Sequence, residues 1–96
     1  MIATEEVIAK LKANKPILFE KYPIRSLAIF GSHARNEQAD DSDVDVLVDF
    51  NDKIGLQFVD LADELEVLIG RKIDLVSRGG IKEKYFQCIK EDLIYV

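Results

Sequence analysis

One segment restricts the fold of this chain more than any other, the run Asp43–Phe50. It is rich in β-branched residues and alternates polar with apolar side chains, except at Leu47, which takes a place that the alternation would make polar. This pattern predicts a strand. Alternate side chains of a strand share a face, so the strand places Asp43 and Asp45 together, about 6.7 Å apart.

The rest of the chain alternates between helical and extended patterns. Apolar residues at spacings of three and four predict a helix over 56–69, and Gly70 stands where a glycine commonly ends a helix. Apolar and β-branched runs predict strands at 27–30 and 72–76. The other predicted elements are a helix capped by Thr4 that breaks at Pro16 and continues to Tyr22, a short helix over 33–38 capped by Ser32, a loop at 40–42, a last helix within 81–89 and a terminal strand over 93–96.

Strands that alternate with helices in so short a chain predict an α/β (α+β) fold, with a mixed sheet flanked by helices. Residues 1–96 are predicted to form a single domain, because two cores would leave each half near the limit of about 40 residues below which chains need disulfides or metals. The composition is 48% hydrophobic and 32% charged, which excludes disordered and low-complexity classes.

Charge and composition also limit the kinds of partner that we expect for this chain. The chain has 18 acidic against 13 basic residues and a net charge of −5, which argues against general binding to nucleic acid. Its apolar runs are shorter than the roughly 20 residues of a membrane helix, and it has no signal-peptide pattern, so we expect a cytoplasmic protein without a membrane partner. Cys88 cannot form an internal disulfide, and its place in the last helix predicts a small buried side chain.

The aspartates indicate a cation site. At 6.7 Å, Asp43 and Asp45 would repel by about 2.5 kcal/mol at an effective dielectric near 20, which favours a positive charge between them. Asp74, on another predicted strand, could complete an oxygen-only site suited to Mg²⁺ or Mn²⁺. The alternative is a charged, solvated edge strand. An EF-hand is excluded, because Val46 replaces the required glycine and Asp52 the required glutamate.

Gly31 and Ser32 indicate an anion site. A buried strand that ends in Gly-Ser and opens into a helix presents free backbone N–H groups, a hydroxyl and the positive end of the helix dipole to a phosphate. The alternative is an ordinary turn with a serine N-cap. Combined with the three aspartates, however, this corner predicts metal-assisted transfer from a nucleoside triphosphate.

These residues resemble a known signature. Gly31-Ser32, ten further residues, Asp43-Val44-Asp45 and a later Asp74 are similar to the motif of the polymerase-β-like nucleotidyltransferase superfamily. The segments 30–35 and 42–48 resemble its minimal members, the MNT proteins, which typically pair with HEPN proteins in prokaryotic toxin–antitoxin systems. The likeness spans nearly the whole chain.

The resemblance implies a role for each motif residue. Asp43, Asp45 and Asp74 would be the catalytic and metal-binding set for two Mg²⁺ ions, with Asp74 assisting deprotonation of the attacking hydroxyl. Gly31 and Ser32 would bind the β- and γ-phosphates of ATP.

Three neighbouring positions carry separate predictions. Arg35 either contacts a phosphate or pairs with a nearby aspartate to orient it. His33, the only histidine, is predicted to face solvent. Asn36 stands where many relatives have glycine, and asparagine tolerates the left-handed backbone that such a turn needs.

The implied function is Mg²⁺-dependent transfer of AMP from ATP to a hydroxyl, expected to be a tyrosine, of a HEPN toxin that this chain neutralises as an antitoxin. One alternative is a non-catalytic antitoxin that acts by binding alone, and another is nucleotidyl transfer to a small molecule. The expected partners are therefore ATP and the toxin, with no direct nucleic-acid binding. Nothing in the sequence opposes a homo-oligomer.

Overall fold

The computed structural model describes residues 4–39 and 42–96, so residues 40 and 41 of the predicted loop lie outside the described residues. The sheet is mixed and has the strand order β3-β2-β1-β4, in which β2 and β3 are parallel and the other pairs antiparallel. This confirms the predicted fold class. The elements are α1 (Thr4–Lys21), β1 (Ile24–Phe30), α2 (Gly31–Ala34), β2 (Val44–Phe50), α3 (Gln57–Ile69), β3 (Ile73–Ser77), α4 (Glu83–Ile89), the 3-10 helix η1 (Lys90–Asp92) and β4 (Ile94–Tyr95).

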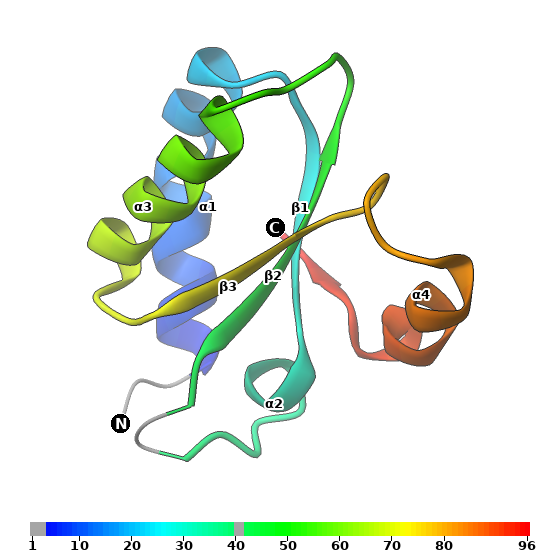
Figure 1. The fold of residues 1–96 in the computed structure, drawn as a ribbon. Helices are drawn as coiled ribbons and strands as arrows, with labels where there is room; N and C mark the ends of the chain where they lie inside the picture. The colour runs from blue at the N-terminus through cyan, green and yellow to red at the C-terminus, as the bar shows by residue number, and fades with distance from the viewer. Residues whose placement is uncertain (1–3, 40–41) are drawn as a thin grey trace.

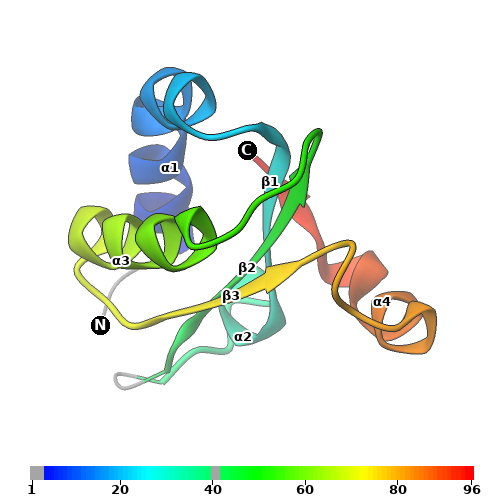
Figure 2. The ribbon, with the colours of Figure 1, turned by 45° about the horizontal axis from the view of Figure 1, so that its top comes forward.

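The two faces of the sheet are covered unequally. Helices α1 and α3 lie side by side on one face, and α4 with η1 lies on the other side of the molecule (Figures 1 and 2). The main core fills the first face, where the valines of β2 pack against buried leucines of α1 and α3. A smaller cluster of Phe30, Leu47 and Ile89 occupies the second face, which explains why Leu47 interrupts the polar alternation of its strand.

Helix α3 and the strands follow the sequence pattern closely. Gly70 ends α3 with a left-handed φ of 75°, as its position predicted. The terminal strand β4 pairs with β1 and thereby fixes the C-terminal segment to the sheet. None of the helices in the described part of the chain has the length and apolarity needed to span a membrane.

The predicted break at Pro16 is wrong, because α1 runs through the proline without interruption. Proline lacks the N–H that would bond to the carbonyl of Lys12. Both residues are exposed, so water can hydrate that carbonyl. Leu11 and Leu18, which are fully buried, hold the helix against the core on either side of the proline. Thr4 lies within α1 rather than capping it, and its hydroxyl donates to the carbonyl of His33.

The structure contradicts the predictions for Ser32 and Cys88 and confirms the one for Asn36. Helix α2 begins at Gly31 and ends at Ala34, so Ser32 lies inside it and does not cap it. Asn36 ends the turn with a φ of 57°, which confirms the predicted left-handed position. Cys88 is exposed instead of buried, because α4 meets the sheet through Phe86 and Ile89.

Candidate active site

Asp45 and Asp74 lie side by side on the thinly covered face of the sheet. They are register partners in the parallel pair β2 and β3. Their strand neighbours Val44 and Ile73 point into the main core, so both carboxylates project from the opposite face. Asp43 directly precedes β2 and is exposed. The structure therefore brings Asp45 and Asp74 together, and Asp43 lies near enough for its charge to act on Asp45.

This arrangement disturbs the ionisation of one acid. The pKa of Asp45 is raised to about 6, first by burial and then by the charge of Asp74 and a hydrogen bond with it; Asp43 adds a smaller repulsion. The positive charge of Arg35 opposes the shift. The site thus has a surplus of negative charge.

The donor set fits a hard divalent cation. The ligands are carboxylate oxygens only, and a cation would offset the repulsion that raises the pKa of Asp45. Among residues 4–39 and 42–96, no three acidic, histidine or cysteine side chains form a ready-made cage. Mg²⁺ does not require one, since it commonly binds through one or two carboxylates, substrate phosphates and water.

Gly31 connects the predicted phosphate corner to these carboxylates. Its φ is +74°, a left-handed conformation that favours glycine. A Cβ atom at this position would collide with Oδ2 of Asp45. Phe30, the preceding residue, is the register partner of Asp45 on β1. The first turn of α2, including Ser32, is therefore built directly against the acidic site.

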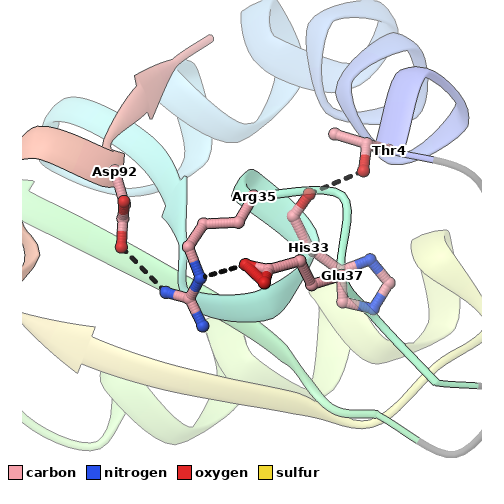
Figure 3. Close-up of polar contacts among 5 residues, drawn as sticks. All are labelled: Thr4, His33, Arg35, Glu37 and Asp92. Atoms are coloured by element: carbon pink, nitrogen blue, oxygen red, sulfur yellow. Dashed lines mark hydrogen bonds and ion pairs between the residues drawn. The ribbon is translucent and has the colours of Figure 1, made fainter.

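Arg35, at the end of α2, is held by two acids that the sequence did not indicate. Its Nε donates to Glu37 Oε1 and its Nη1 to Asp92 Oδ2, each at 2.8 Å (Figure 3). Within the described residues, the ion pairs of Arg35 are with Glu37 and Asp92, and not with Asp43, Asp45 or Asp74. No local pattern could have revealed Asp92, which lies 57 residues from Arg35 in the chain.

The prediction that His33 faces solvent is wrong, because its side chain is fully buried. The Thr4 hydroxyl donates to the His33 carbonyl at 2.6 Å and so ties α2 to the start of α1 (Figure 3). Neither ring nitrogen makes a hydrogen bond of normal geometry with a described residue, although the backbone of Ser42 lies near enough to favour protonation. Burial nevertheless dominates and lowers the pKa of His33.

The segment that leads into β2 is held in place by two residues that follow α3 in the chain, Arg71 and Lys72. Arg71 donates from Nη2 to the carbonyl of Ser42 at 3.0 Å, and the N–H of Val44 donates to the carbonyl of Lys72 at 2.9 Å. These contacts set the height of Asp43 above the sheet. Asp43 and Asp74 are exposed, and Asp45 is half-buried.

Comparison with known proteins places this arrangement in context. The model of the polymerase beta nucleotidyltransferase family matches residues 11–95. A protein of Methanocaldococcus jannaschii that is provisionally named a protein adenylyltransferase is 49% identical over 98 residues, and the match covers 100% of each chain. Protein adenylyltransferase MntA of Thermococcus cleftensis is 37% identical over 97 residues, covering 100% of this chain and 98% of its own.

Solved structures share the fold. One provisionally described as a minimal nucleotidyltransferase superposes with a TM-score of 0.82 at 30% identity, covering 97% of this chain and 95% of its own. Another shows a tri-AMPylated HEPN toxin of Shewanella oneidensis in complex with an MNT antitoxin; the match has a TM-score of 0.61 at 19% identity and covers 96% of this chain and 66% of the other.

Proposed function

Since this chain belongs to the polymerase beta nucleotidyltransferase family and is a nucleotidyltransferase, we propose that it transfers AMP from ATP to a hydroxyl group of a partner protein. The observation that carries the proposal is the Asp45–Asp74 pair, packed against the glycine that opens α2. Relatives named protein adenylyltransferases, which match the full length of this chain, support AMP as the transferred group and a protein as the acceptor.

Each motif residue has a defined task in this reaction. The backbone of Gly31 and Ser32 and the guanidinium of Arg35 bind the triphosphate. Asp43, Asp45 and Asp74 would hold Mg²⁺, which would neutralise the phosphates and lower the pKa of the attacking hydroxyl. The acceptor oxygen bonds to the α-phosphorus, the bond to pyrophosphate breaks, and the hydroxyl proton passes to the exposed carboxylate of Asp74.

The acceptor that fits best is a tyrosine of a HEPN toxin, whose modification would make this chain an antitoxin. A side chain presented by another protein could reach this site, because Asp43 and Asp74 are exposed. The shared fold with an MNT antitoxin bound to a tri-AMPylated HEPN toxin supports this class of partner.

The test uses ATP labelled at the α- or γ-phosphate, Mg²⁺ and a cognate HEPN protein. We expect the α-label, and not the γ-label, to appear on a tyrosine of that protein. Asp45→Asn should remove the signal. Asp49→Asn is the matched control, because Asp49 lies on the same strand and face but near Arg25, away from the site. Neutralisation of the toxin without label, equal for both variants, would instead establish inhibition by binding alone.

A further inference from the structure

The two acids that bind the Arg35 guanidinium, Glu37 and Asp92, differ in how well they can hold it in one position. Glu37 is two residues away in the chain, and its side chain is 62% exposed, so it moves with the same turn. The side chain of Asp92 is 28% exposed and belongs to a different element, η1. Of the two hydrogen bonds that raise the pKa of Arg35, the one to Asp92 has the larger effect.

Asp92 is itself anchored to the sheet. The next residue, Leu93, packs on the cluster that contains Phe30, immediately before the motif glycine. The following residues pair with β1, and the N–H of Val96 donates to the carbonyl of Leu27 at 3.0 Å. Asp92 therefore holds the Arg35 guanidinium in a fixed position relative to β1 and to the acidic site at the end of that strand.

The guanidinium keeps donors for a ligand. The two ion pairs use Nε and Nη1, whereas Nη2 makes no hydrogen bond within the described segments 4–39 and 42–96. The group lies near enough to Asp45 for its charge to act on that carboxyl. A planar guanidinium that is already held in place loses less conformational freedom when it binds a phosphate.

We propose that Asp92 is the positioning residue for Arg35, and that through this ion pair the C-terminal segment forms part of the nucleotide site. The inference rests on the proposed function, because it takes a phosphate of ATP as the ligand of Arg35. Asp92 does not touch the nucleotide, so its effect must pass through Arg35.

The test is a double-mutant cycle of Asp92→Asn and Arg35→Ala, read by binding of a non-hydrolysable ATP analogue with Mg²⁺ and by steady-state transfer. We expect Asp92→Asn to weaken analogue binding and raise KM for ATP about threefold to fivefold, with kcat within twofold. This is the upper end of the range for surface ion pairs, because the Asp92 side chain is only 28% exposed. In the Arg35→Ala background the same change should have no further effect. Glu37→Gln, the matched control, should change binding less than twofold.

The outcomes separate this inference from the proposed function. Equal weakening by Asp92→Asn with and without Arg35 would overturn the positioning role, and so would equal effects of Asp92→Asn and Glu37→Gln. Loss of binding with a matching fall in melting temperature would show a structural role and overturn it as well. If the analogue binds and the cycle shows coupling but no AMP reaches any protein, the proposed transfer fails while the positioning role stands.

Discussion

Asp45 and Asp74 face each other at one register position of the parallel strands β2 and β3, where burial and the charge of Asp74 raise the pKa of Asp45. A fold selected only for stability gains nothing from this contact, because burial and like charge both oppose ionisation. The pair is understandable as a cation site, in which a bound ion offsets the repulsion between the two carboxylates.

The charge of Asp45 should lower the stability of the metal-free protein above its pKa. Its folded pKa of about 6 exceeds the ordinary 3.8, so the contribution to stability is complete below about pH 4 and is lost as pH rises through 6. In EDTA at pH 7.5, Asp45→Asn should be more stable than the unsubstituted protein by about 1 kcal/mol, after allowance for solvent screening. Denaturant unfolding at pH 4 and 7.5 measures the change, and a gap independent of pH would contradict it.

Mg²⁺ should stabilise the folded protein through the same acids. A cation that binds only the folded state raises its stability by mass action, so saturating Mg²⁺ at pH 7.5 should raise the melting temperature by a few degrees. Asp45→Asn and Asp74→Asn should each reduce this rise, whereas Asp49→Asn should keep it. The measurement is thermal unfolding against MgCl₂, with NaCl at equal ionic strength as the reference. Equal effects of the two salts would show screening alone.

Gly31→Ala and Gly70→Ala form a matched pair. Both glycines have a left-handed φ, of 74° and 75°, so each alanine should cost about 1 kcal/mol in backbone strain. Only at Gly31 would the new Cβ meet Asp45, since nothing lies within 4 Å of the corresponding position at Gly70. Gly31→Ala should therefore lower AMP transfer about a hundredfold, as expected for a displaced catalytic group. Gly70→Ala should keep it, and equal losses in both variants would contradict the contact.

His33 should make the protein sensitive to acid. Its folded pKa lies below the ordinary 6.5, so on acidification the unfolded chain takes up a proton that the buried ring resists. Stability should therefore fall as pH drops below about 6.5, opposite in sign to the effect of Asp45. His33→Gln removes this titration, so its free energy of unfolding should decline less between pH 7.5 and 5. Parallel declines in both proteins would show that His33 does not contribute.

Local pattern was enough to predict much of the fold and the candidate site. The period of α3 and its terminal Gly70 depend on residues within one helix, and the alternation of β2 places Asp45 on the face opposite its core valines. The left-handed turn at Asn36 is also a local preference. Such features follow from the local geometry of the backbone and do not depend on which other element packs against the helix or strand.

The tertiary structure decided what a side chain meets beyond its own element. His33 is buried because the start of α1 covers α2, and Cys88 is exposed because α4 meets the sheet on its other side. Likewise, only the parallel register sets Asp74 beside Asp45, and only the return of the C-terminal segment to β1 brings Asp92 to Arg35. Periodicity specifies the faces of an element, whereas burial and ion pairing depend on which distant element each face meets.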